Sequence, residues 1–287
     1  MKKRFTILII FFSFTSLSSQ DYDVGIRAGL NFAKFLGPSE TGVVENFSLS
    51  SGFHFGINFQ WNFNSVLGVR SEVLYTQIGS QYTFNGEGYY VFDLPTFSRF
   101  VVRDISQIDL DISNAHISFP ITAHITVTEK LEIFGGGYLN LLVSPIGTGS
   151  WKFGVLDENA PDYAFDQGLD YDYNSDRAGE FNLFARSIGI IVNDQNVDLN
   201  GIVGAYYLFD TVEENRFTKV DYGLIGGAAY YLNKGLFVSA RLEYGLTDIT
   251  NTRADNSLKD INSNGTFIFN DDYDRNLNIA ISMGFKF

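Results

Sequence analysis

The chain has 287 residues, no cysteine and a formal net charge of −13 at pH 7. Without cysteine it has no disulfide framework, no thiolate metal site and no lipidated N-terminal cysteine. The acidic balance argues against a nucleic-acid partner, because such partners are bound by clustered lysines and arginines. Phosphate-binding loops, dinucleotide-binding glycine patterns and zinc-ligand spacings are absent from the sequence, so no cofactor is predicted.

The N-terminus, MKKRFTILIIFFSFTSLSSQ, has the organisation of a secretory signal peptide. Lys2, Lys3 and Arg4 precede an apolar segment from Phe5 to Phe14, and small residues follow it. This segment is shorter than the roughly 20 residues of a spanning helix. We predict a cleaved signal peptide over residues 1–19 and an exported domain over residues 20–287, with an uncleaved anchor or a buried helix as the alternative.

The exported part alternates between apolar and polar residues with period two, which indicates β-strands with one apolar face. Seven segments show the alternation clearly: Val24–Phe32, Phe53–Phe63, Leu67–Tyr75, Ile117–Val127, Tyr222–Leu232, Leu236–Leu246 and Leu277–Phe287. Three more are expected to be strands, although apolar residues fall on both of their faces: Leu131–Val143, Phe181–Val192 and Leu199–Phe209. The count is about ten strands.

The connections between these strands alternate in length. Tight turns are expected at Asn62–Ser65, Thr128–Lys130, Asn193–Val197 and Asn233–Lys234. Long polar loops are expected at Leu36–Phe47, Thr83–Gln107, Thr148–Gly179, Thr211–Thr218 and Ile249–Asp274. Short turns at one end and long loops at the other are typical of a membrane barrel, whereas the Greek-key crossings of a sandwich mix the two.

The apolar faces are too hydrophobic to be exposed to water. A strand exposing Phe53, Phe55, Phe59 and Trp61 on one side would aggregate, whereas lipid solvates such a face and ring closure removes unpaired strand edges. The opposite faces carry polar side chains that suit a lumen: Arg27, His54, Arg70, Glu72, Glu132, Arg241 and Glu243. Aromatic residues near strand ends suit interfacial girdles: Trp61, Phe63, Tyr207, Phe209 and Tyr230.

These observations predict an all-β fold, a transmembrane antiparallel up-and-down β-barrel in the outer membrane of a Gram-negative bacterium. It would have about ten strands, with eight as the alternative, short periplasmic turns and long extracellular loops. Its lipid-facing side makes outer-membrane lipid its first partner.

Four stretches resemble the PorT-like outer-membrane β-barrel proteins of Bacteroidetes: VGIRAGLNFAKF, LGVRSEVLYTQIGS, VDYGLIGGAAYYLNKGLFVSARLEYGLTDI and ISMGFKF. They cover the first, third and last strands and a late hairpin. The resemblance implies insertion by the barrel-assembly machinery, which recognises a last strand ending in aromatics, here Phe285 and Phe287. Some relatives support protein secretion and gliding. Many relatives look eight-stranded, so the segment Phe181–Phe209 would add a hairpin here.

His116 and Ser118 are the candidate catalytic residues. Two positions apart on a strand, they share a face, and they are similar to the His-x-Ser pair of lipid A deacylase barrels. In that family the pair faces lipid, whereas here it falls on the lumen side, so lumen-lining polar residues are the competing interpretation. An omptin-like protease would need acid–histidine pairs at the outer rim. The loops are acidic, but all three histidines lie in predicted strands.

The stretch DYDYNSD places Asp170, Asp172, Asn174 and Asp176 at the spacing of a calcium-binding loop. Ser175 replaces the expected glycine and Phe181 the expected glutamate, so the competing interpretation is a solvated acidic loop or a protein-contact surface. The same loop region also carries Asp157, Glu158, Asp162 and Asp166.

The leading hypothesis for function is a non-enzymatic, structural or partner-binding barrel, with a secretion-related role implied by the resemblance. Its acidic extracellular loops would contact a protein partner that the sequence does not identify. A narrow small-solute channel is the second hypothesis and a lipid A-modifying enzyme the third. Barrels of about eight strands are filled by side chains, which favours a plugged or narrow bore.

Overall fold

The computed structural model describes residues 21–38, 44–94, 97–155, 162–180, 188–192, 195–199, 201–254, 258–261, 267–269 and 273–287. The predicted signal peptide, the predicted loop residues Asp157 and Glu158, and Phe181 at the start of a predicted strand lie outside these ranges. No helix in the described part of the chain is long and apolar enough to cross a membrane.

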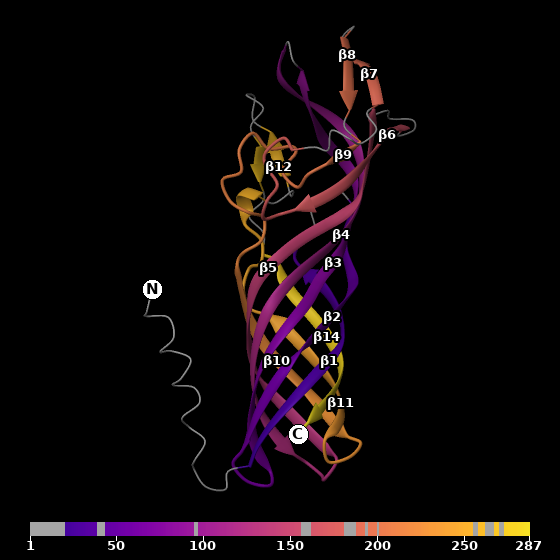
Figure 1. The fold of residues 1–287 in the computed structure, drawn as a ribbon. Helices are drawn as coiled ribbons and strands as arrows, with labels where there is room; N and C mark the ends of the chain where they lie inside the picture. Colours follow the sequence, from indigo (N-terminus) through magenta and orange to yellow (C-terminus); the bar gives the residue numbers. More distant parts are fainter. Residues whose placement is uncertain are drawn as a thin grey trace, which may run out of the picture.

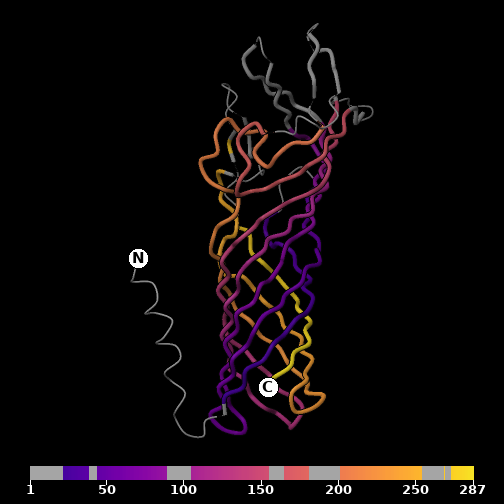
Figure 2. Tube along the Cα trace, viewed as in Figure 1, coloured from indigo at the N-terminus to yellow at the C-terminus, as the bar shows by residue number. Residues whose placement is uncertain are grey.

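Eight antiparallel strands form a closed ring (Figure 1). They are β1 (Asp21–Leu36), β2 (Val44–Asn62), β3 (Leu67–Leu94), β4 (Phe97–Thr126), β5 (Leu131–Val155), β10 (Val220–Tyr231), β11 (Leu236–Gly245) and β14 (Arg275–Lys286). Consecutive strands in this list pair with each other, including β5 with β10. The pairing of β1 with β14 then closes the ring. The C-terminus lies at the same end as the tight turns (Figure 2).

Two further strands extend the sheet to ten in the described residues. The first part of β5 pairs with β10 up to Leu141, and from Ile146 onward β5 pairs instead with β6 (Asp162–Asp172). The short strand β9 (Ile202–Val203) then runs parallel to β6. The predicted all-β barrel with about ten strands is confirmed, and eight of the ten strands make the ring.

The segment Phe181–Phe209 does not add a hairpin to the ring, so that prediction is wrong. Its described strands β7 (Ile188–Val192) and β8 (Gln195–Leu199) pair only with each other, beyond the loop end of the ring (Figure 1). Five residues each are too few to cross a membrane, which takes about 9–11 residues of a tilted strand. A second small hairpin, β12 (Leu258–Ile261) with β13 (Phe267–Phe269), follows the short 3₁₀ helix η1 (Thr252–Ala254).

Two segments predicted as loops are largely strand. β3 and β4 continue through the predicted loop Thr83–Gln107 and remain paired up to Leu94 and Phe97. The predicted loop Thr148–Gly179 contains the end of β5 and all of β6. These strands continue past the part of the ring that carries the exposed apolar side chains, so the ring bears a tall extension at its loop end.

The tight turns are stabilised by side chains that accept hydrogen bonds from backbone N–H groups, as asparagine and threonine commonly do in turns. The Asn64 carboxamide oxygen accepts the N–H groups of Val66 and Leu67, each at 2.8 Å. Asn233 does the same for Gly235 and Leu236 in the turn between β10 and β11. These local bonds keep one end of the ring compact.

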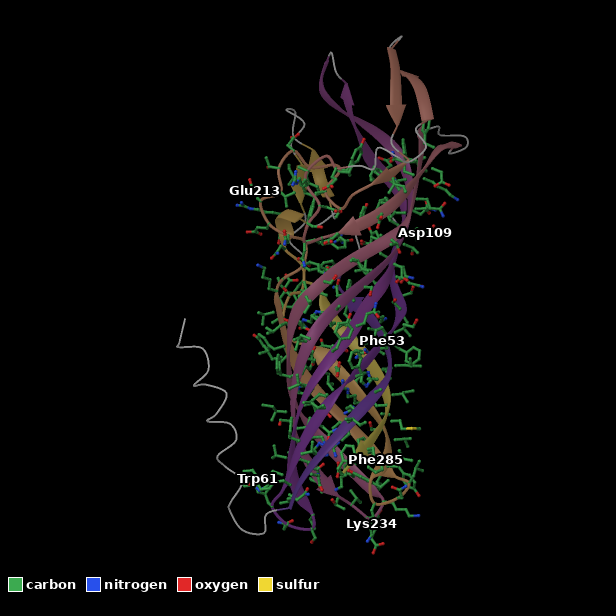
Figure 3. All side chains as sticks on the ribbon, in the orientation of Figure 1. Phe53, Trp61, Asp109, Glu213, Lys234 and Phe285 are labelled. Carbon is green, nitrogen blue, oxygen red and sulfur yellow. The ribbon has the colours of Figure 1, made fainter. Side chains whose placement is uncertain are left out.

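The outward face of the lower ring is apolar and exposed. Phe53, Trp61 and Phe285 project away from the ring (Figure 3). The same belt includes residues of all eight ring strands, among them Ile26, Leu30, Phe55, Ile57, Val73, Ile121, Ile133, Leu139, Leu224, Leu242, Ile279 and Ile281. Of the predicted girdle residues, Trp61, Phe63 and Tyr230 are exposed, whereas Tyr207 and Phe209 pack against a buried cluster and are not girdle residues.

The interior changes character along the ring axis. Near the turns it is polar and charged, whereas the loop-end extension encloses an apolar cluster that we call the outer apolar core: Phe35, Tyr82, Phe84, Leu110, Ile112, Trp151, Phe153, Leu169, Tyr171, Tyr173, Val203, Ala205, Tyr206, Phe217 and Ile249. The extension therefore has the packing of a water-surrounded domain, apolar inside and polar outside.

A charge on the exposed apolar belt should destabilise the ring. Ile57 lies in mid-β2 with 43% of its surface exposed. We expect Ile57→Arg to lower the free energy of unfolding in lipid vesicles by about 2–4 kcal/mol, as arginine does at a bilayer midplane. Ser65→Arg, at an exposed position of the turn between β2 and β3, is the control and should change it by less than about 0.5 kcal/mol. Equal effects of the two variants would show that the belt does not face lipid.

Candidate functional site

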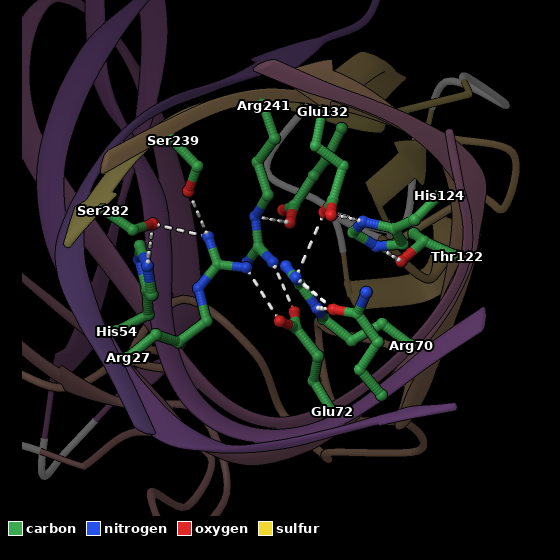
Figure 4. Close-up of polar contacts among 12 residues, drawn as sticks. Arg27, His54, Arg70, Glu72, Thr122, His124, Glu132, Ser239, Arg241 and Ser282 are labelled. Atoms are coloured by element: carbon green, nitrogen blue, oxygen red, sulfur yellow. Dashed lines mark hydrogen bonds and ion pairs between the residues drawn. The ribbon is translucent and has the colours of Figure 1, made fainter. Parts of the chain in front are cut away.

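The seven polar residues predicted to face a lumen all lie inside the ring and are at least 94% buried. They come from β1, β2, β3, β5 and β11, and strand alternation turns each of them inward while its apolar neighbours face out. Figure 4 shows the side chains of Arg27, Glu72 and Arg241 reaching toward one another across the bore. Ion pairs and hydrogen bonds join them into two neighbouring groups, one around Glu72 and one around Glu132, which together we call the lumen network.

Glu72 is the centre of the lumen network. One carboxylate oxygen accepts Arg27 Nη1 at 2.8 Å and the other accepts Arg241 Nη1 at 3.0 Å. Arg241 also pairs through Nε with Glu243 at 2.8 Å. Because Arg27, Glu72 and Arg241 come from three different strands, this chain of charges spans the bore from wall to wall.

Arg27 and His54 connect the network to hydroxyl groups on β11 and β14. Arg27 Nη2 donates to the hydroxyls of Ser239 (3.1 Å) and Ser282 (2.6 Å). His54 lies between Ser282, at 2.7 Å from Nε2, and the Asn31 carboxamide oxygen, at 2.8 Å from Nδ1. The contacts with Ser239 and Ser282 join strands that are far apart in the sequence.

Arg70 organises the part of the network nearest the turns. It donates to the Gln60 carboxamide oxygen (3.0 Å from Nε), to Glu132 (3.1 Å) and to the Tyr231 hydroxyl (3.1 Å). Its guanidinium lies over the Phe237 ring, 5.3 Å from the ring centre. An arginine in such a site satisfies its fixed fork of donors while its flat face stacks on an aromatic ring.

His124 completes this second group. Its Nδ1 contacts Glu132, its Nε2 lies 2.8 Å from the Thr122 hydroxyl, and its ring stacks on Phe134 at 4.9 Å. Glu132 is thus held by both Arg70 and His124. The lumen network sets three arginines against three glutamates, and the pairing compensates for the loss of water that burial imposes on each charge.

Glycines make the bore narrow enough for this packing. A Cβ atom at Gly284 would collide with the Phe237 ring, and one at Gly136 would collide with the backbone carbonyl of Ile121. The absence of a side chain therefore lets neighbouring strands and rings approach closely.

A separate polar cluster surrounds Asp221, closer to the loop end. The Asp221 carboxylate accepts hydrogen bonds from Thr247 (2.7 Å), Asn276 (3.0 Å), Asn140 (3.2 Å) and Tyr138 (3.4 Å). Neutral donors alone solvate this buried charge, since no ion pair to Asp221 occurs among the described residues. Sequence reasoning missed two inward-facing residues, Asp221 and Tyr231. Each is adjacent to an exposed tyrosine, Tyr222 or Tyr230, and adjacent side chains of a strand point to opposite faces, so alternation could have found them.

His116 and Ser118 are both buried inside the ring on β4. His116 Nδ1 lies 3.1 Å from the backbone carbonyl of Asn114, and no hydrogen bond joins His116 to Ser118 within the described residues. Their position toward the bore, away from the lipid-facing belt, does not give a membrane lipid access to the pair.

Two of the calcium candidates, Asp172 and Asp176, accept hydrogen bonds from backbone N–H groups. Asp172 accepts the N–H groups of Asn174 (3.0 Å) and Ser175 (3.2 Å), and Asp176 accepts those of Asp172 (3.0 Å) and Ala205 (2.8 Å). Loss of solvent raises the pKa of Asp176 above its ordinary value. Asp170 is exposed on β6, and the described residues hold no group of three or more acidic, histidine or cysteine side chains suited to a metal ion.

Comparison with known proteins identifies the family. A model described as outer membrane protein beta-barrel domain matches residues 18–251. The chain belongs to this family. The protein is therefore located in the outer membrane, its tight turns are periplasmic and its loop-end extension is extracellular. No curated protein matches the chain.

Several solved structures of bacterial surface proteins are similar to the chain. Ail, the attachment invasion locus protein of Yersinia pestis, is 10% identical over 92% of this chain and 98% of its own, with a TM-score of 0.35. Neisserial surface protein A is 12% identical over 92% and 97%, with a TM-score of 0.34. OprG from Pseudomonas aeruginosa is 13% identical over 94% and 98%, with a TM-score of 0.32.

The periplasmic mouth of this outer-membrane barrel is a polar cavity of about 510 Å³. Gln60, His124, Glu132 and Tyr231 line it, so the second group of the lumen network is also its inner wall. At its rim, Lys286 pairs with Asp23 at 2.8 Å. Solvent from the periplasm can thus reach the group around Glu132. Farther into the bore, the Arg27–Glu72–Arg241 chain blocks the way.

The C-terminal aromatics lie at this periplasmic end. Phe285 and Phe287 are 40% and 73% exposed, and their rings meet edge to face at 5.2 Å. The Phe287 N–H donates to the Val24 carbonyl at 2.8 Å, which joins the last residue to the first strand. Recognition of these aromatics by the assembly machinery stays a prediction.

Breaking the centre of the lumen network should be strongly destabilising. In Glu72→Gln, Arg27 and Arg241 would lose their shared carboxylate while remaining buried, which should lower the free energy of unfolding by about 3–5 kcal/mol. Urea unfolding in lipid vesicles measures the change. Glu129→Gln, at an exposed periplasmic turn, is the matched control and should have almost no effect. A loss below about 1 kcal/mol in Glu72→Gln would contradict a structural role for the pairing.

Proposed function

We propose that the protein is a non-enzymatic outer-membrane barrel whose membrane part anchors an extracellular partner-binding surface. The observation that carries this proposal is the extent of the structure beyond the apolar belt. β3 has 28 residues and β4 has 30, whereas crossing the membrane takes about 9–11. A barrel that served only to cross the membrane would not need a packed extracellular extension of this size.

The outer face of the extension is acidic. Asp109, Asp111, Asp166 and Asp170 are exposed on β4 and β6, which flank β5. Asp111, Thr148 and Asp170 lie in one register across the three strands. We call Asp109, Asp111 and Asp170 the acidic face, since Asp166 lies opposite Lys152 of β5. It suits a partner with a basic surface, because complementary charge speeds encounter and favours the correct partner.

Neutralising the acidic face should weaken partner binding without unfolding the barrel. Cross-linking and affinity purification from native outer membrane should recover a protein with the wild type and lose it with a variant carrying Asp109→Asn, Asp111→Asn and Asp170→Asn. Binding of the identified partner, remeasured with purified components, should weaken as salt rises, since exposed charges are screened.

Glu129→Gln, an exposed carboxylate on the periplasmic side, is the control and should bind like the wild type. Partner binding that is the same in the triple variant and in this control would exclude the acidic face as the contact surface.

The alternative function, a small-solute channel, is disfavoured by the Arg–Glu chain across the bore. Purified protein in planar bilayers should show no steady large conductance, because ring strands and side chains fill a bore of this size. The recording should be made at several salt concentrations, since screening acts weakly on buried pairs. Steady large conductance at moderate salt would overturn the proposal in favour of the channel.

The third hypothesis, a lipid A-modifying enzyme, depends on His116 and Ser118. Both residues are buried in the bore and His116 is directed to a backbone carbonyl. The lipid A profile of the host should therefore be unchanged in His116→Ala and in Ser118→Ala, as judged by mass spectrometry. A modified lipid A species that disappears in both variants would establish the enzyme.

The resemblance to PorT-like barrels supports a secretion-related role for this protein in a member of the Bacteroidetes. The resembling stretches lie mostly in ring strands, so they indicate the barrel architecture more strongly than they indicate a specific partner. A component of the secretion apparatus is the first candidate for the protein recovered by affinity purification.

A further inference from the structure

Asp221 is a buried carboxylate for which the lumen network offers no positive partner. It is 3% exposed inside the ring, on β10. Its hydrogen-bond donors are all neutral: Thr247, Asn276, Asn140 and Tyr138. Within the described part of the chain, no lysine, arginine or histidine forms an ion pair or a hydrogen bond with it.

The charges inside the ring show what this carboxylate lacks. The lumen network is balanced, because three arginines are set against three glutamates in it. Asp221 therefore adds one negative charge that no arginine of the network balances. Buried charges in proteins are paired with an opposite charge or coordinate a metal ion. The surroundings of Asp221 hold the ligands for a cation but not the cationic side chain.

Two carboxamide oxygens beside Asp221 accept no hydrogen bond from the described residues. They are Asn140 Oδ1 and Asn276 Oδ1, on side chains that are 1% and 2% exposed. The amide nitrogens of the same two groups lie 3.2 and 3.0 Å from Asp221 Oδ2. A buried acceptor without a donor is unfavourable and indicates a further ligand.

The same carboxamides can turn their oxygens toward the carboxylate. Half a turn of a side-chain amide exchanges the positions of its oxygen and its nitrogen. The oxygens of Asn140 and Asn276 would then face Asp221 Oδ2, which the Tyr138 hydroxyl already contacts at 3.4 Å. Oxygen ligands at right angles around a calcium-sized ion, each about 2.3–2.6 Å from it, lie roughly 3.3–3.7 Å apart. Sodium has a similar size, so it fits among these oxygens after they move apart by a few tenths of an ångström.

We propose that Asp221, Asn140 and Asn276 form a binding site for one sodium ion inside the ring. Oxygen donors of this kind favour hard cations. The single carboxylate balances a monovalent ion, whereas calcium would bring one positive charge too many. The site lies on the loop side of the lumen network, and its occupation does not depend on the acidic face or on a protein partner.

The dependence of stability on sodium tests the site. An ion that binds the folded ring and not the unfolded chain stabilises the fold as its concentration rises. Urea unfolding in lipid vesicles is measured at low and high sodium chloride, with choline chloride keeping the ionic strength constant. Between about 1 mM and 100 mM sodium, the unfolding equilibrium constant of the wild type should fall at least about ten-fold, as a dissociation constant of about 10 mM or less produces.

Asp221→Asn removes the charge of the site and keeps its shape, so its unfolding constant should be the same in sodium and in choline. Asn276→Ala removes one carboxamide and keeps the charge, and it should reduce the sodium effect without abolishing it. The matched control is the acidic-face variant Asp109→Asn, Asp111→Asn and Asp170→Asn, which loses exposed carboxylates only. It should keep the full sodium effect.

Three results would overturn the proposal. The first is a wild type that unfolds equally in sodium and in choline, as expected if a proton on Asp221 or a water molecule among the carboxamides satisfies the site. The second is a sodium effect of equal size in the wild type and in Asp221→Asn, which would place the ion elsewhere. The third is a stronger stabilisation of the wild type by calcium than by sodium at the same concentration.

Discussion

The rest of the structure depends on how a narrow, closed ring accommodates charge. Eight strands leave a bore that side chains must fill, and the inward positions of the lower ring carry arginines and glutamates. Such groups are tolerated out of water only when each one is paired and hydrogen-bonded. Glu72 held between Arg27 and Arg241 satisfies that condition and at the same time joins three strands. The same contacts therefore stabilise the ring and block its bore.

The outer face and the extension follow from the same ring. In the membrane the strands are apolar outside and polar inside, whereas above it they are polar outside and apolar inside. β3 shows the inversion within one strand: Arg70 and Glu72 face in near the turns, and Tyr82 and Phe84 face in near the loops. The change in solvent, from lipid to water, reverses which side chains face inward. The extension becomes an extracellular body packed around the outer apolar core, and it carries the acidic face on its outside.

The alternation of single strands was sufficient to predict the barrel class, the lipid-facing belt and the inward position of the polar residues. The final strand, from Leu277 to Phe287, shows this most clearly, since its apolar and small residues alternate without interruption. The extended parts of β3 and β4 were predicted as a loop because polar outward residues there look like loop residues when the inversion is not recognised. The segment Phe181–Phe209 was predicted as a hairpin of the ring because its apolar content suggests strands, but its described strands are too short to cross the membrane.

The individual contacts within the lumen network could not be predicted from the sequence. Arg27 and Glu72 are 45 residues apart, and which arginine meets which glutamate depends on the stagger of the strands around the ring. The pairing partner of β5 also changes along its length, from β10 to β6, and alternation carries no record of a partner. Asp221 was overlooked because a single acidic residue at the start of a strand looks like the end of a loop.

The most direct test of a bore closed by paired charges uses the absence of cysteine from the native chain. Asn58→Cys places one thiol inside the ring, at a position that is 1% exposed, and Asn64→Cys places one in a periplasmic turn. The measurement is the rate at which a small charged thiol reagent modifies Asn58→Cys in outer-membrane vesicles opened to both sides. The account predicts that this rate is at least about a hundred-fold slower than for Asn64→Cys, since the reactive thiolate is disfavoured in a site without water. Equal rates at the two positions would show a water-filled bore and contradict the account.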